Sequence, residues 1–155
     1  MSASARRRFI SVLAGLAATP LWVARGVRAQ PQPANQLEPL IAKMTGGKPV
    51  RRGRVTVSTP RLADNGHSVP LTVSVTSPMT AADHVLSITL LYERNPRPVM
   101  AIYHLGPKSG RATVATRVRL NGSQRVLALA QLSDGSFWSG SAEVEVTESA
   151  CLDAT

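Results

Sequence analysis

The side chain with the clearest capacity for covalent chemistry is Cys151, the only cysteine in the sequence, four residues before Thr155. Because there is no second cysteine, it cannot form a disulfide within the chain. Side chains this close to a chain end seldom have enough neighbours to stay buried. Three roles remain open: an intermolecular disulfide, a reactive thiol presented to other proteins, or a free cysteine without function. A thiolate is nucleophilic enough to hold sulfur in a reversible covalent linkage.

No other group of residues has the composition of a catalytic site. The three histidines, His67, His84 and His104, are far apart in the sequence and lack metal-ligand spacing. Acidic residues are sparse and form no pair suited to general acid–base catalysis. The glycine pair Gly46-Gly47 lacks the spacing of a phosphate-binding loop. We therefore expect a protein that is not an enzyme and that holds no metal and no cofactor.

The net charge of +9 at first suggests nucleic acid binding. Five arginines, however, lie in residues 1–29, a region without acidic residues: Arg6, Arg7, Arg8, Arg25 and Arg28. Without them, 13 basic and 9 acidic residues remain, a net charge of +4. That value is ordinary for a soluble domain, so we expect no nucleic acid partner, although a mildly basic surface still attracts small anions.

Residues 1–29 have the pattern of an export signal. Arg6-Arg7-Arg8 precedes an apolar run, Phe9–Ala18, that is too short and too rich in alanine and glycine to span a membrane. Val27-Arg28-Ala29 has the small residues that a signal peptidase accepts, which places the mature start at Gln30. The paired arginines are typical of a twin-arginine signal, and a general secretory signal is the alternative. Either route predicts a periplasmic protein without a membrane anchor.

Residues 30–52 are predicted to form a linker and a short helix. Asn35 is a suitable N-cap and Glu38 completes a capping box, while Gly46-Gly47 ends the helix. Its narrow apolar stripe predicts packing against the edge or end of a sheet. The stripe consists of Leu37, Leu40, Ile41 and Met44.

Residues 53–147 are predicted to form an all-β, immunoglobulin-like antiparallel β-sandwich. Apolar and polar residues alternate with a period of two in several segments, among them 55–58, 71–76, 86–92, 112–120 and 142–147. The segments Val99–Leu105 and Val126–Leu132 are apolar on both faces, which is typical of central strands. Turn signals such as Asp64-Asn65-Gly66 and Asp134-Gly135 separate the strands. Residues 148–155 would then project from the last strand as an arm that carries Cys151.

Two arginines, Arg117 and Arg119, fall on one face of a predicted strand. They could bind an anion or pair with Glu143 and Glu145 across the sheet. We favour the cross-strand ion pairs.

Several motifs occur in the order seen in one family. They are Thr45-Gly46-Gly47-Lys48-Pro49, Leu62–Pro70 with its Asn-Gly-x-x-Val-Pro core, Ser77-Pro78-Met79-Thr80, Asn95-Pro96, Thr116–Leu120 and Ser133–Trp138. Together with the export signal and the cysteine near the end, they make the chain resemble the SoxY family over almost its whole mature length. The resemblance implies an immunoglobulin-like sulfur carrier of the periplasmic thiosulfate-oxidising system. Cys151 would be its covalent attachment point.

The resemblance also implies partners. A SoxY protein forms a heterodimer with a SoxZ subunit. It meets, transiently, a haem-containing enzyme that loads the cysteine, a hydrolase that releases sulfate, and a sulfane dehydrogenase.

The tail departs from the family pattern, which is Gly-Gly-Cys-Gly-Gly. Here Ser149-Ala150 precedes Cys151 and Leu152-Asp153 follows it. Glycine gives such an arm conformational freedom, so these residues stiffen it, and the Asp153 carboxylate should raise the pKa of the thiol. The alternative function is therefore a SoxY-like binding or scaffold module, or a carrier for another periplasmic oxidation system.

Overall fold

The computed structural model describes residues 37–148, and the fold is given for these residues alone. The predicted signal peptide, the linker with Asn35, and Cys151 lie outside them.

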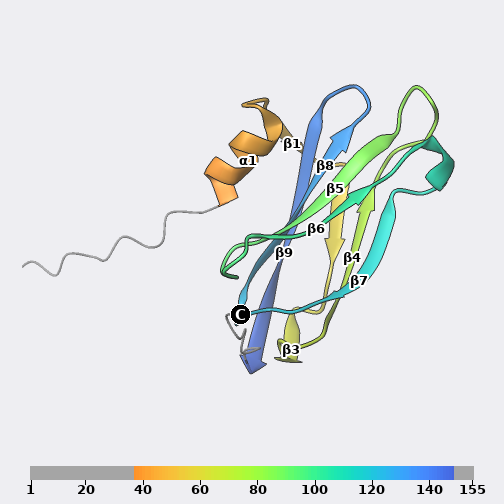
Figure 1. The fold of residues 1–155 in the computed structure, drawn as a ribbon. Coiled ribbons are helices and arrows are strands. Elements are labelled where there is room, and N and C mark those ends of the chain that lie inside the picture. The colour runs from red at the N-terminus through yellow and green to blue at the C-terminus, as the bar shows by residue number, and fades with distance from the viewer. Residues whose placement is uncertain (1–36, 149–155) are drawn as a thin grey trace, which may run out of the picture. The chain divides into compact units, whose positions relative to one another are not determined.

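The described residues form two packed β-sheets and one α-helix (Figure 1). The helices are α1 (Leu37–Thr45) and a short 3₁₀ helix, η1 (Pro107–Ser109). The strands are β1 (Val50–Arg52), β2 (Val55–Ser58), β3 (Leu62–Asn65), β4 (Val69–Val75), β5 (Val85–Tyr92), β6 (Val99–His104), β7 (Thr113–Val118), β8 (Gln124–Leu132) and β9 (Phe137–Glu148). The larger sheet has the order β1-β9-β8-β5-β6, with β3 also paired to β9, and the smaller sheet has the order β2-β4-β7.

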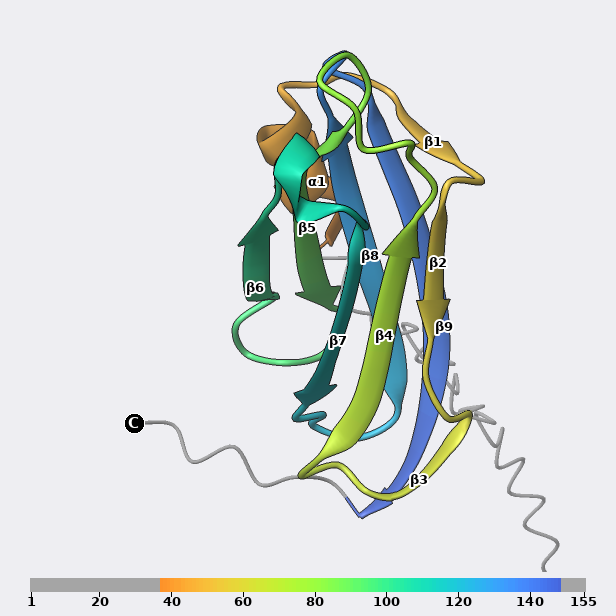
Figure 2. The ribbon, with the colours of Figure 1, turned by 90° about the vertical axis from the view of Figure 1, so that its right-hand side faces the viewer.

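The predicted all-β, immunoglobulin-like sandwich with a short N-terminal helix is confirmed. In Figure 2, strands β7, β4 and β2 of the smaller sheet lie in front of β5, β8 and β9 of the larger one. Most pairings are antiparallel, but β1 and β3 each run parallel to β9, which the alternation of residues did not predict. Strand β1 lies within the segment that was expected to contain only linker and helix.

The core lies between the two sheets and follows the predicted alternation. In β4, Leu71, Val73 and Val75 are each at most 6% exposed, whereas Thr72 and Ser74 between them are half-buried. They belong to one hydrophobic cluster with residues of β5 and β8. Burying each such side chain contributes about 1.5–3 kcal/mol, so the cluster holds the two sheets together as one body.

Helix α1 ends as its sequence predicts. Gly46 and Gly47 have positive φ values of 62° and 77°, which glycine adopts without strain. The amide of Gly47 donates to the carbonyl of Ala42 at 2.9 Å and closes the last turn. The apolar stripe packs on the outer face of the larger sheet, away from the smaller one, and not at an edge or end as expected. Its cluster contains Leu37, Leu91, Leu129 and Phe137.

One of the two strands predicted to be central lies at the edge of its sheet. Residues 126–132 do form a central strand, β8, but residues 99–104 form β6, which lies at the edge of the larger sheet. Both faces of β6 are apolar because each meets a different hydrophobic cluster. Tyr103 packs against the core between the sheets, and Val99 packs against the cluster under α1. Ile102 remains 50% exposed.

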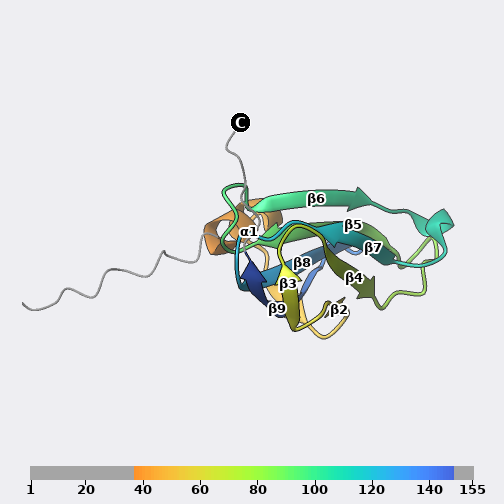
Figure 3. The ribbon, with the colours of Figure 1, turned by 90° about the horizontal axis from the view of Figure 1, so that it is seen from below.

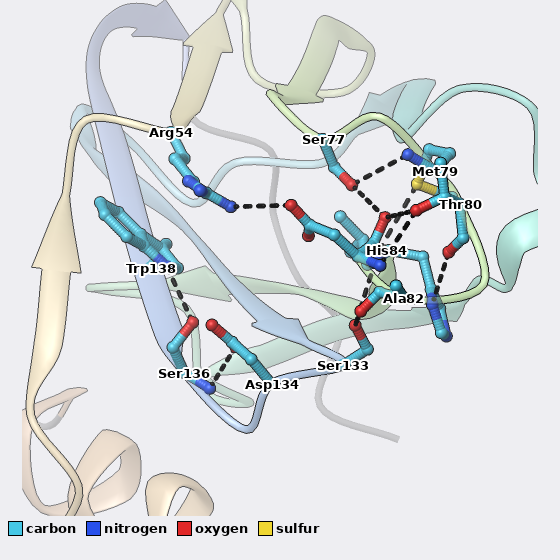
Figure 4. Close-up of polar contacts among 12 residues, drawn as sticks. Arg54, Ser77, Met79, Thr80, Ala82, His84, Ser133, Asp134, Ser136 and Trp138 are labelled. Carbon is cyan, nitrogen blue, oxygen red and sulfur yellow. Dashed lines mark hydrogen bonds and ion pairs between the residues drawn. The ribbon is translucent and has the colours of Figure 1, made fainter.

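Polar contacts fasten the β8–β9 turn to the loop between β4 and β5 (Figure 4). The Ser133 hydroxyl accepts a hydrogen bond from the amide of His84 at 3.1 Å and donates to the carbonyl of Ala82 at 3.2 Å. Beyond the turn, the indole of Trp138 lies 5.1 Å from the guanidinium of Arg54. Since β9 has 12 residues, at about 3.3 Å each, this end lies far from the one at which β9 finishes.

Candidate functional site

The end of β9 extends beyond the strand that neighbours it in the sheet. Its pairing with β8 finishes where Gln124 lies opposite Val144, so residues 145–148 continue past β8. On the other edge, β3 runs parallel to these residues, with Leu62 opposite Glu145 (Figure 3). The last part of β9 is therefore held mainly by β3.

Hydrogen bonds fix this last part of β9 on both sides. The amide of Gly66 donates to the carbonyl of Glu148 at 2.7 Å, and the carbonyl of Gly66 accepts from the amide of Leu120 at 2.8 Å. On the opposite side, the Ser123 hydroxyl accepts from the amide of Val146 at 2.9 Å. The segment that follows Glu148 thus starts from a fixed point. Cys151 comes three residues later, outside the described residues.

The turn expected at Asp64-Asn65-Gly66 begins later than the sequence suggested. Asp64 and Asn65 finish β3, because parallel pairing with β9 keeps these turn-favouring residues extended. The chain then turns at residues 66–68, where the Asn65 carboxamide oxygen accepts from the amide of His67 at 3.2 Å.

Two buried amide side chains tie together the loops near the end of β9. Asn95 is 7% exposed and Gln124 is 6% exposed. The Gln124 amide donates to the Asn95 oxygen at 2.6 Å, and the same oxygen accepts from the amide of Asn121 at 3.1 Å. The Asn95 amide donates to the carbonyl of Arg119 at 3.0 Å. Sequence reasoning used Asn95-Pro96 as a turn signal and a family motif and did not predict these side-chain contacts. Gln124, a polar residue at the start of the apolar strand β8, was the signal it missed.

A groove of about 1100 Å³ lies beside the end of β9. It is formed by residues 141–145 of β9, the beginning of β8, the segment after β5 and the chain around β3. Four arginines line it, together with three glutamates. These residues are Arg52, Arg61, Arg94, Arg125, Glu93, Glu143 and Glu145. Sequence reasoning did not single out this set of arginines, since they come from four separate segments.

The ion pairs expected between Arg117 or Arg119 and Glu143 or Glu145 are not formed. Strand β7, which carries Arg117, pairs with β4 in the smaller sheet, whereas Glu143 and Glu145 lie on β9 in the larger one. The Arg117 guanidinium instead donates to the hydroxyl of Ser68 at 2.6 Å. The residue opposite Glu143 in the larger sheet is Arg125.

The three histidines are not brought together. His67 and His104 are exposed, and a ring nitrogen of the half-buried His84 lies 3.0 Å from the carbonyl oxygen of Thr80. Within residues 37–148, no three His, Cys, Asp or Glu side chains are arranged to hold a metal ion. In the same residues, no helix has the length and apolar character needed to cross a membrane.

The fold and the fixed end of β9 define a class: a rigid immunoglobulin-like sandwich whose last strand leads into a segment with a single thiol. A family model described as "Sulfur oxidation protein SoxY" matches residues 41–151, a range that ends at Cys151. The chain belongs to the SoxY family.

Solved structures agree with the fold. The sulfur carrier protein SoxY from Chlorobium limicola f. thiosulfatophilum is 25% identical, with a TM-score of 0.62 over 74% of this chain and 98% of that one. A superoxide reductase (neelaredoxin) from Ignicoccus hospitalis is 19% identical, with a TM-score of 0.55 over 61% of this chain and 80% of that one. The second similarity concerns the fold alone. Among curated proteins, none matches the sequence.

Proposed function

We propose that this protein is a periplasmic sulfur carrier that holds thiosulfate-derived intermediates covalently on Cys151. The observation that carries the proposal is the fixed end of β9, three residues before the only cysteine. A carrier needs a stable body and a short segment that can enter other active sites, and this arrangement provides the fixed point between the two. The family match that extends to Cys151 supports the same role.

The loading step is an oxidation. The Cys151 thiolate and the sulfane sulfur of thiosulfate form an S–S bond, giving Cys–S–S–SO₃⁻, and two electrons pass to a haem-containing enzyme. A hydrolase then adds water to the terminal sulfur and releases sulfate and two protons, which leaves a persulfide on the cysteine. A sulfane dehydrogenase oxidises the remaining sulfane sulfur. The carrier supplies the nucleophile, and its partners supply the catalysis.

A SoxZ-like subunit is the proposed stable partner, and the edge strand β6 is a suitable surface for it. Strand β6 contains no lysine and no proline, the residues that usually protect an exposed edge, and Ile102 on it is 50% exposed. We expect Ile102→Lys to weaken copurification with the partner. Leu62→Lys, which places the same charge on an exposed leucine of β3 near the opposite edge, should leave it intact.

Intact-mass measurement tests the carrier function. The wild-type protein, Cys151→Ser and the control Ser149→Ala would be isolated from a thiosulfate-oxidising bacterium grown with and without thiosulfate. We expect thiosulfate-dependent adducts on the wild type and on Ser149→Ala, and none on Cys151→Ser. If no adduct forms and Cys151→Ser still supports thiosulfate oxidation, the protein is a scaffold module and not a carrier.

A further inference from the structure

The groove beside the end of β9 has an uneven distribution of charge. Arg125 forms an ion pair with Glu93 at 3.1 Å, and Glu143 lies opposite Arg125 in the sheet. Glu93 is the only carboxylate within residues 37–148 that forms an ion pair with Arg125, and the Nε of Arg125 is buried without a hydrogen-bond partner. Because one edge of its guanidinium is already bound to Glu93, Arg125 has less of its charge free for a ligand than an unpaired arginine has.

The other three arginines of the groove, Arg52, Arg61 and Arg94, are exposed and form no ion pair within residues 37–148. Counting all seven charged residues, four arginines and three glutamates, the groove carries a net charge of +1. One singly charged anion would neutralise it. Glu145 is the remaining carboxylate of the groove. Within the described residues it forms no ion pair with an arginine and lies opposite none in the sheet.

The distance from the end of β9 limits which arginines a group on Cys151 could reach. Three residues separate Glu148 from Glu145, about 10 Å along a strand. The three residues from 149 to 151 span at most about 10 Å when extended. If the chain turned back after Glu148, Cys151 would come level with Glu145, whose amide donates to the carbonyl of Arg61 at 2.8 Å. Arg52 lies opposite Ser139 near the start of β9. That position is six residues from Glu145, about 20 Å along the strand, which is beyond this reach.

We propose that Arg61 and Arg94 bind the sulfonate group (–SO₃⁻) of a sulfur intermediate. Guanidinium groups recognise such oxyanions through paired, charge-assisted hydrogen bonds. The physiological meaning of this site rests on the proposed function, because the nearest source of a sulfonate is the adduct on Cys151. Binding would hold the loaded segment against its own sheet between visits to partner enzymes. Free thiosulfate carries the same group and is the other possible source.

Chemical loading tests this site without any partner enzyme. Tetrathionate reacts with the thiolate of the full chain to give Cys–S–S–SO₃⁻ and thiosulfate, an exchange of S–S bonds without net oxidation. As Cys151 is the only cysteine, the adduct has one location. The side-chain NMR signals of the arginines are compared before and after loading, and the rate at which a small dithiol removes the adduct is measured. A separate sample of Cys151→Ser is titrated with sodium thiosulfate at constant ionic strength.

We expect loading to shift the signals of Arg61 and Arg94. Arg61→Gln and Arg94→Gln should together speed removal of the adduct by a factor of about five, the effect of two solvent-exposed ion pairs. Glu145→Gln should slow removal, because it takes a competing carboxylate out of the groove. Arg111→Gln, an exposed arginine outside the groove, is the matched control and should change neither readout.

Each outcome distinguishes the hypotheses. Shifts in the loaded wild type but not in Cys151→Ser with thiosulfate identify the covalent adduct as the ligand. Shifts in Cys151→Ser with thiosulfate, without shifts in the loaded wild type, identify a site for the free anion. Unchanged signals in both samples, or equal effects of Arg111→Gln, overturn the proposal. If the loaded protein binds its adduct here but the protein from the native host carries none, the site stands and the carrier function fails.

Discussion

The substitution Gly140→Ala tests how closely the two sheets approach each other. Gly140 lies on β9 opposite Ala128, and the backbone of β2 crosses it. A Cβ atom at Gly140 would lie 3.0 Å from the carbonyl carbon of Val55 and closer still to its carbonyl oxygen. Both are backbone atoms, so the contact cannot be relieved by rotating a side chain. Strand β2 would have to move away from β9.

Overpacking of this kind costs about 1–3 kcal/mol, and we expect the upper end of this range because backbone must move. For a domain of this size, a loss of about 3 kcal/mol in the free energy of unfolding lowers Tm by about 10 °C. Urea unfolding followed by tryptophan fluorescence measures the change directly. Gly106→Ala is the matched control: its φ of −149° suits any residue, and no atom lies within 4 Å of the added Cβ.

We expect Gly106→Ala to be neutral or slightly stabilising, since alanine reduces the freedom of the unfolded chain. If Gly140→Ala unfolded within about 0.5 kcal/mol of the wild type, the ordinary effect of a harmless substitution, β2 and β9 would not be in the contact described. An unchanged dependence on urea concentration would show that the variant still unfolds in one step.

Three further changes have definite expected results. Asn95→Ala removes three hydrogen bonds, one from the buried Gln124 side chain and two partly buried ones with backbone groups of Arg119 and Asn121, and should reduce the free energy of unfolding by about 3 kcal/mol. The control Asn121→Ala, which loses only an exposed side chain, should be near neutral in the same urea assay. Burial raises the pKa of Tyr92 from 10.0 to about 12, so the phenol stays protonated to higher pH in the folded state than in the unfolded state. The contribution of Tyr92 to stability is therefore fully present below pH 10 and is lost as the pH rises towards 12. At about 1.36 kcal/mol per unit, the loss is about 3 kcal/mol, and Tyr92→Phe should abolish this part of the alkaline dependence. Hydrogen bonds from Ser136 hold the pKa of Asp134 below its usual range, and Ser136→Ala should raise it in an NMR titration.

Much of the fold could be predicted because the order of apolar and polar residues in a strand reflects which of its faces is buried. Alternation identified β4, β7 and β9, and the run at 126–132 identified the central strand β8. Alternation does not say which strand lies beside which. Residues 99–104 looked central because both of their faces are apolar, yet one face meets the core and the other the helix cluster. The prediction was wrong because two apolar faces show that a strand is covered on both sides, and not that it has a neighbouring strand on both edges.

The candidate site was harder to predict because it depends on pairings between distant segments. Cys151 is visible in the sequence by its type alone. The groove, in contrast, joins Arg61, which precedes β3, with Arg94, which follows β5, and β9 and β8 lie between these two strands in the sheet. Only the parallel β3–β9 pairing brings Arg61 to the end of β9. The expected pairing of Arg117 with Glu143 failed for the same reason, since the two residues fall in different sheets.

The end of β9 is held in a way that suits a carrier. In β3, Leu62 is 58% exposed and only Ala63 is half-buried, so apolar burial contributes little to its pairing with β9. Hydrogen bonds from the backbone and from Ser123 hold the strand end instead. Elements with few buried apolar contacts open more readily than the core around them. If β3 separated from β9 and the hydrogen bond between Ser123 and Val146 also broke, the four residues 145–148 would extend the reach of Cys151 by about 13 Å, while the buried strands β5 and β8 stayed in place.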